Sequence, residues 1–193
     1  MKTVMQLLTI GIFATCLSCN SQQSKDTTSR ADSTNEAMID SSHAAGTPPP
    51  VAEKDAKFAV DAANGGMAEV QLGEMAQNQG ADPKVKEFGK MMVTDHSKAN
   101  DELKMIAAGK NITLPAAPGD DMQKVANDLS SKSGADFDKA YVKQMVDDHE
   151  KTVKLFEDAQ KEVQDSDLRA FAVKTLPVLR THLEHIRALK KAK

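Results

Sequence analysis

The chain has 193 residues, a formal net charge of −3, 27% charged residues, one tyrosine and no tryptophan. This composition has no basic excess and few aromatic rings on which bases could stack, so it argues against a nucleic-acid-binding surface. The sequence contains no recognisable phosphate-binding loop, cofactor fingerprint or activated nucleophile, and therefore it does not indicate an enzyme.

The amino terminus is typical of an exported lipoprotein. An apolar run from Val4 to Leu17 follows Lys2; it is too short to cross a bilayer as a helix but suits a secretory signal. A small residue then stands directly before Cys19. We therefore predict a lipoprotein-type signal peptide over residues 1–18 and lipidation of Cys19. The protein would then be anchored in the bacterial envelope by its lipid, on the outer membrane and facing the periplasm.

A plain cleaved signal is the alternative, and it would leave a free periplasmic protein. It stays open because Cys16, and not an aliphatic residue, stands three positions before Cys19. In the lipidated form the mature domain has no free thiol and no disulfide, so its stability must come from its core.

Residues 19–52 are expected to form a disordered tether. The segment is rich in Ser, Thr, Gln, Asp and Ala and ends with "TPPP", so it offers too little apolar area to offset the entropy cost of ordering. His43 lies within it and is expected to be solvated.

From residue 53 to residue 191 apolar residues recur with helical spacing, which predicts one all-α domain. The expected helices span about 53–79, 83–108, 135–163 and 167–192, with a short helical piece at 122–129. Short turns near residues 80–82 and 164–167 predict two antiparallel hairpins, whereas the long connection between them can travel the length of a bundle. The sequence therefore predicts a four-helix bundle with a long crossover between helices two and three, which places these two helices parallel.

Each predicted helix carries one ionisable residue within its apolar stripe: Glu69, His96, His149 and His182. Counting from the turns places all four near one level of the bundle. Buried polar groups need partners, so a shared metal ion or a hydrogen-bonded cluster is expected. Three imidazoles and one carboxylate suit a single Zn, Cu, Ni or Fe ion, and the four residues are therefore candidate metal ligands.

Three further residues are candidates for supporting this site from outside the ligand set. Asp95 and Asp148 lie about 100 degrees around their helices from the histidines and can accept hydrogen bonds from ring nitrogens, although exposed aspartates are an equally good interpretation. His185 lies one turn beyond His182, as a further candidate or a solvent-facing residue. Methionines near the same level can offer sulfur to copper or simply fill the core: Met67, Met91, Met92 and Met145.

Three segments resemble one family: "FGKMMVTDH" from Phe88, "FDKAYVKQMVDDHEKTVKLF" from Phe137 and "LRAFAVKTLPVLRTHLEHIRAL" from Leu168. They are similar to DUF4142, a family of ferritin-like exported bacterial proteins, over residues 53–189. The resemblance implies a ferritin-like crossover bundle and export, but no activity.

Ferritin-like di-iron enzymes carry Glu-x-x-His pairs on two of their helices. This chain departs from that pattern, because Val93, Val146 and Leu179 stand three positions before the three histidines. The departure disfavours a di-iron centre that activates oxygen.

Two hypotheses follow. In the first, the protein is a metal-binding bundle of the envelope, for storage, sensing or modest redox chemistry. In the second, it is a structural or interaction lipoprotein with an unidentified protein partner, and the buried His and Glu residues only fix the helix register.

Overall fold

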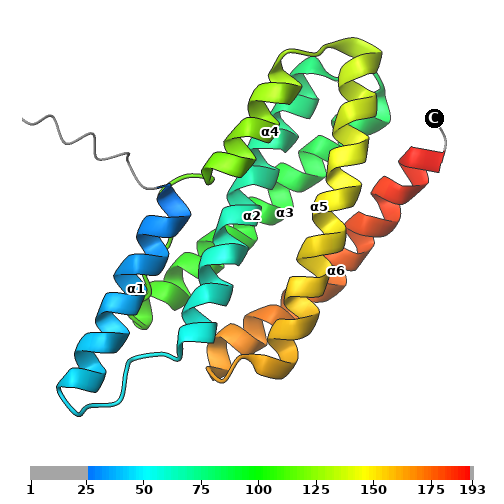
Figure 1. The fold of residues 1–193 in the computed structure, drawn as a ribbon. Coiled ribbons are helices and arrows are strands. Elements are labelled where there is room, and N and C mark those ends of the chain that lie inside the picture. The colour runs from blue at the N-terminus through cyan, green and yellow to red at the C-terminus, as the bar shows by residue number, and fades with distance from the viewer. Residues whose placement is uncertain (1–25, 192–193) are drawn as a thin grey trace, which may run out of the picture.

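The computed structural model describes residues 26–191, which form six helices and no strand (Figure 1). The helices are α1 (Thr27–Ala44), α2 (Glu53–Gln79), α3 (Pro83–Gly109), α4 (Asp120–Ser130), α5 (Gly134–Glu162) and α6 (Ser166–Lys191). The predicted all-α class is confirmed, and α2 to α6 agree closely with the predicted segments. The predicted signal peptide and Cys19 lie outside the described residues. Between residues 26 and 191, no helix combines the length and the apolar character needed to cross a membrane.

Side-chain caps stand where the two short turns end and α3 and α6 begin. Asp82 accepts a hydrogen bond from the backbone N–H of Lys84 at 2.9 Å, and Pro83 occupies the first position of α3. Asp165 likewise accepts from the N–H groups of Asp167 and Leu168, both at 3.0 Å. These caps satisfy N–H groups that a helix start otherwise leaves free, and so they fix where α3 and α6 begin.

A buried aspartate holds each turn from the opposite hairpin. Asp138 of α5 binds the α2–α3 turn, and Asp55 of α2 binds the α5–α6 turn; the two side chains are among the buried polar residues. The donors are the backbone N–H groups of Ala81 and Asp82 (3.0 and 2.9 Å) and of Gln164 and Asp165 (3.0 and 2.8 Å). Helices α3 and α5 therefore begin at the same end of the molecule and run in the same direction, as Figure 1 also shows.

The core consists of two apolar clusters, and α2, α3, α5 and α6 contribute to both. One cluster contains Phe58, Phe156 and Phe171, and the other contains Phe88 and Phe137. Along each of the four helices a buried polar residue lies at the boundary between the clusters: Glu69, His96, His149 and His182. The common level predicted from the sequence is therefore the layer between two halves of the core.

Helices α2 and α3 come close together at a pair of glycines. A Cβ atom on Gly89 would lie 2.6 Å from the carbonyl oxygen of Gly73, and a Cβ atom on Gly73 would lie 2.6 Å from that of Gly89. Only residues without a side chain permit this backbone contact. The contact lies one turn from Glu69 on α2, and it helps to bring Glu69 against α3.

Residues 27–44 form helix α1, so the prediction of a disordered tether over 19–52 is wrong for this part of the chain. The buried Asn35 exchanges hydrogen bonds with both backbone groups of Thr113, at 2.8 and 3.0 Å, and Thr27 donates to the carbonyl of Ala117 at 2.8 Å. These partners lie far along the chain, in the connection before α4, and compensate for the weak apolar face of α1. His43 is exposed at the end of α1.

Candidate metal centre

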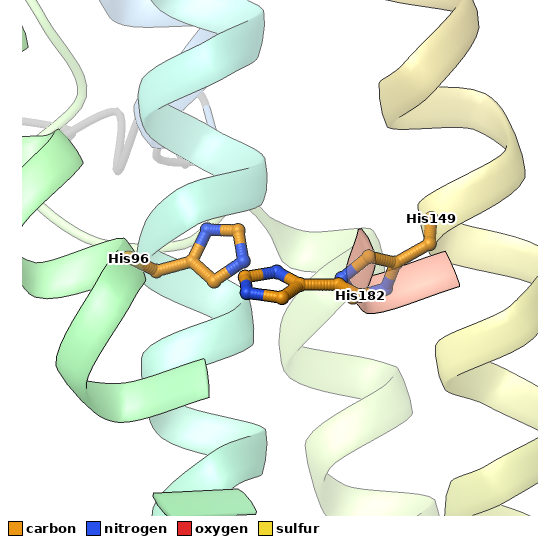
Figure 2. A group of neighbouring side chains, drawn as sticks. All are labelled: His96, His149 and His182. Carbon is orange, nitrogen blue, oxygen red and sulfur yellow. The ribbon is translucent and has the colours of Figure 1, made fainter. Parts of the chain in front are cut away.

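Three histidine side chains meet in the layer between the two apolar clusters. Figure 2 shows His96 from α3, His149 from α5 and His182 from α6 with their rings directed toward one another. One ring nitrogen from each residue lies within 4.8 Å of the others. All three residues are 5% exposed or less. The sequence prediction placed these three residues together, and the structure brings them to the spacing of ligands around one ion.

The outer nitrogen of each ring has an acceptor beside it. His149 Nδ1 lies 2.9 Å from the carbonyl oxygen of Met145, and His182 Nε2 lies 2.8 Å from Oδ2 of Asp95. His96 Nδ1 lies 3.0 Å from Oε2 of Glu69. Carbonyl and carboxylate oxygens accept hydrogen bonds, so neutral His149 and His182 carry their hydrogen on these outer nitrogens.

The remaining nitrogen of each ring is buried and has no hydrogen-bond partner among the described residues. These atoms are Nε2 of His96, Nε2 of His149 and Nδ1 of His182. Each one carries a lone pair when the hydrogen sits on the other nitrogen. A buried acceptor without a partner costs roughly 1–3 kcal/mol, so three of them in one layer call for a shared partner.

Glu69 of α2 lies beside the outer nitrogens of His96 and His149. Its carboxylate oxygens lie 3.0 Å from His96 Nδ1 and 3.4 Å from His149 Nδ1, although neither contact has good hydrogen-bond geometry. The cluster with ligand spacing consists of the three histidines and does not include Glu69. The sequence prediction treated Glu69 as a fourth ligand, whereas its position suits a carboxylate that orients two ligand rings.

Burial keeps the three rings neutral. Burial lowers the pKa of His96 well below its usual value, and the neighbouring His149 and His182 lower it further. Burial also lowers the pKa of His149, to about 4, and that of His182, which Asp95 partly restores. Burial and the charge of Asp148 raise the pKa of Glu69 well above its usual value. The 3.0 Å contact between His96 and Glu69 is therefore not a simple ion pair, and the rings are in the form that binds metal ions.

Acid is expected to destabilise the metal-free protein through His149. Unfolded His149 takes up a proton below its ordinary pKa of 6.5, but the folded protein does so only near 4. The unfolded state therefore binds more protons between these two pH values. The contribution of His149 to the free energy of unfolding falls as the pH falls, by about 3 kcal/mol at pH 4. Urea unfolding at pH 7 and pH 4 measures this loss, and His149→Gln should show a loss smaller by about that amount.

The comparison with His149→Gln also separates this effect from that of Glu69. The raised pKa of Glu69 acts in the opposite direction, because stability from its neutral form is lost as the pH rises. That contribution is largely common to the two proteins and cancels in the difference. Equal acid sensitivity of the two proteins would show that His149 is not held neutral.

The supporting residues named from the sequence have different surroundings. Asp95 contacts His182, as described above, and its side chain is 39% exposed. Asp148 is buried and accepts hydrogen bonds from Gln144 at 2.9 and 3.0 Å, and no hydrogen bond joins it to a histidine. His185 is exposed and lines a groove between α3 and α6. Met92 and Met145 belong to the apolar core, whereas Met91 lines the same groove.

Sequence reasoning gave no role to two aromatic residues near the triad: Phe88, which contacts two of its rings, and Tyr141, which contacts Phe88. The ring of Phe88 packs edge to face with the rings of His149 and His182, and its centroid lies 6.0 and 6.4 Å from theirs. The hydroxyl of Tyr141 is buried and lacks a hydrogen-bond partner among the described residues, and burial raises its pKa. The sequence does single out this residue, because Tyr141 is the only tyrosine of the chain and lies two turns before His149 on α5.

Residues 40–189 match the model of one protein family, described as a domain of unknown function, DUF4142. The chain belongs to this family. The resemblance seen in the sequence is thereby confirmed, and the DUF4142 match includes the end of α1 as well as α2 to α6. No curated protein and no solved structure matches the chain. The function of this DUF4142 protein must therefore be argued from the histidine triad.

Proposed function

We propose that this DUF4142 protein binds one transition-metal ion in its core, through Nε2 of His96, Nε2 of His149 and Nδ1 of His182. The main support for the proposal is that two features occur together in each ring of the triad. Each ring has an oxygen within 3.0 Å of its outer nitrogen, and each has a buried nitrogen without a hydrogen-bond partner among the described residues. Histidines that bind metals show this arrangement, since the acceptor fixes the tautomer and the ring orientation.

The same features argue against a layer that only fixes helix register. In such a layer the polar groups would satisfy one another, because a partly satisfied buried network is worse than an apolar core. Here three lone pairs are left over in a place that water does not readily reach. A metal ion is a partner for all three at once.

In this proposal Glu69 lies against the ligand rings of His96 and His149, helps to orient them and is not itself a ligand. The ion then has three neutral nitrogen ligands, a donor set that suits Zn²⁺, Cu²⁺ or Fe²⁺. Three protein ligands leave a further coordination position for water or a small ligand. This is compatible with storage, sensing or modest redox chemistry.

We place this centre in a ferritin-like bundle made of α2, α3, α5 and α6, with the chain crossing over through α4. The support is the common direction of α3 and α5 and the long connection between them. The apolar run before Cys19 supports export and attachment to the outer membrane through a lipid, with the domain in the periplasm. A free periplasmic protein is expected if Cys19 is not acylated.

Metal analysis of the purified protein tests the proposal. About one equivalent of a transition metal is expected, and Co²⁺ added to the metal-free protein should give the visible absorption of nitrogen-coordinated cobalt. His96→Ala should abolish both signals, whereas His185→Ala, in an exposed histidine one turn from His182, should keep them. A protein that neither contains a metal nor takes up Co²⁺, Zn²⁺, Cu²⁺ or Fe²⁺ would refute the proposal.

A further inference from the structure

Two surface depressions approach the histidine triad from different sides. A groove of about 580 Å³ lies between α3 and α6, and Asp95 connects it to His182. A smaller pocket of about 180 Å³ lies between α2 and α5, and Glu69 connects it to His96 and His149. An ion that reaches the triad must pass through the surface somewhere, and the charges of the two depressions differ.

The lining of the smaller pocket is acidic. Its charged residues are Asp61, Asp148 and Lys151, and the buried carboxyl group of Glu69 adds a further oxygen donor, so acidic groups outnumber the single amine. In the groove, by contrast, Glu87 and Asp95 are balanced by Lys84 and Lys90. A concave surface lined by one sign of charge concentrates the opposite ion and speeds its arrival. The smaller pocket therefore favours a cation, and the groove does not.

One residue makes this pocket more than an acidic surface patch. Glu69 is 2% exposed, both of its carboxylate oxygens lack a hydrogen bond, and it lines the pocket while it lies 3.0 Å from His96. It is thus a buried acceptor that a cation in the pocket and the rings of the triad can both reach.

The other charged residues of the lining have partners that can give way. Asp148 is held by the amide of Gln144, which leaves its carboxylate with acceptor capacity to spare. Lys151 lies 4.0 Å from Asp148, with its side chain 74% exposed. Asp61 is paired with Lys57 at 3.1 Å on the surface. A flexible, exposed lysine is easily displaced by an incoming divalent cation, because its own ion pair is weak.

We infer that the pocket between α2 and α5 is an outer cation site, where Asp148 and Glu69 hold a divalent transition-metal ion before it passes to the three histidines. The inference rests on the proposed metal site. Asp148 acts on the route and is not a final ligand, so it governs how fast the ion loads. Oxygen ligands suit this step, because a carboxylate can take a partly hydrated cation and release it to the better nitrogen ligands.

Stopped-flow mixing of the metal-free protein with Co²⁺ tests the inference. Loading, followed by the absorption of the bound ion, should slow about fivefold in Asp148→Asn, since one charge near the path is removed. Lys151→Gln should load faster than the natural protein, because it removes the opposing charge. Release into excess chelator should not be accelerated in Asp148→Asn, as it would be if Asp148 were a ligand of the bound ion.

The control is Asp147→Asn, which makes the same change of charge one residue earlier, at a carboxylate paired with Lys143 and outside the pocket. It should load at the natural rate. The inference is overturned if Asp147→Asn slows loading as much as Asp148→Asn, or if neither Asp148→Asn nor Lys151→Gln changes the rate. Slower loading in Glu87→Gln instead would assign the route to the groove between α3 and α6. If the natural protein takes up no Co²⁺ at all, the proposed metal site itself fails, and the two failures are thus distinguishable.

Discussion

Zinc at one hundred times its dissociation constant is expected to raise the melting temperature of the metal-free protein by about 5–10 °C. A ligand that binds only the folded state at this concentration stabilises it by about 2.7 kcal/mol. For a domain of this size each kcal/mol moves the melting temperature by about 2–4 °C. Thermal melts of the protein treated with a chelator, with and without added Zn²⁺, measure the shift.

The shift should disappear in His149→Ala. His149 is fully buried and supplies one of the three nitrogens that have no other partner, so its removal leaves two ligands for the ion. The alanine variant also leaves a cavity and can be less stable by itself. The comparison is therefore the difference between melts with and without Zn²⁺ for each protein, in which the lower starting stability cancels. His149→Gln, which fills more of the space, provides a second variant.

His185→Ala is the matched control for the zinc effect. His185 is an exposed histidine three residues from His182 and lines the surface groove, so its loss should leave the zinc-induced shift unchanged. If His185→Ala lost the shift as fully as His149→Ala, the stabilisation would come from ions bound at the surface. A natural protein that melts at the same temperature with and without Zn²⁺, Cu²⁺ or Fe²⁺ would favour the register-fixing interpretation.

The histidines of the triad could be predicted from the sequence because helical spacing alone determines which residues face the core. His96, His149 and His182 occupy positions in apolar stripes, and their distances from the short turns place them at one level. The repeated segments "KMMVTDHSK" and "KQMVDDHEK" belong to α3 and α5, which run in the same direction, so equivalent histidines can meet. Local pattern and turn length were sufficient for this part of the site.

The functions of the individual atoms could not be predicted in this way. The stripe places Glu69 in the core, but only the packing of α2 against α3, with its contact between Gly73 and Gly89, sets its carboxylate beside the outer nitrogen of His96. Helix α1 was missed for a related reason. Its stabilising partners, such as Thr113 for Asn35, lie in an irregular connection whose path no periodic pattern encodes.

The two buried aspartates that hold the turns are expected to contribute more to stability than other acidic residues outside the metal centre. Asp138 accepts two backbone hydrogen bonds from the α2–α3 turn, at 3.0 and 2.9 Å, with its side chain buried. Hydrogen bonds to charged groups contribute roughly 1.5–3 kcal/mol each, and a buried N–H group left without an acceptor adds a penalty. Asp138→Ala should therefore lower the free energy of unfolding by about 3–5 kcal/mol in urea denaturation.

Asp136→Ala is the control for Asp138→Ala, because Asp136 is an exposed acid in the first turn of α5, two residues before Asp138. It should change the free energy of unfolding by about 0.5 kcal/mol or less. A loss in Asp136→Ala as large as that in Asp138→Ala would mean that the charge at the start of α5, and not the link to the turn, stabilises the fold.

Asp55→Ala should have an effect similar to that of Asp138→Ala, since Asp55 holds the α5–α6 turn through two hydrogen bonds of 3.0 and 2.8 Å. The two aspartates hold turns at opposite ends of α2, roughly 35 Å apart along the helix. Sites so far apart act independently, so the losses in the double variant should add. If the double variant loses much less stability than the sum of the two single losses, the two turns open together as one unit.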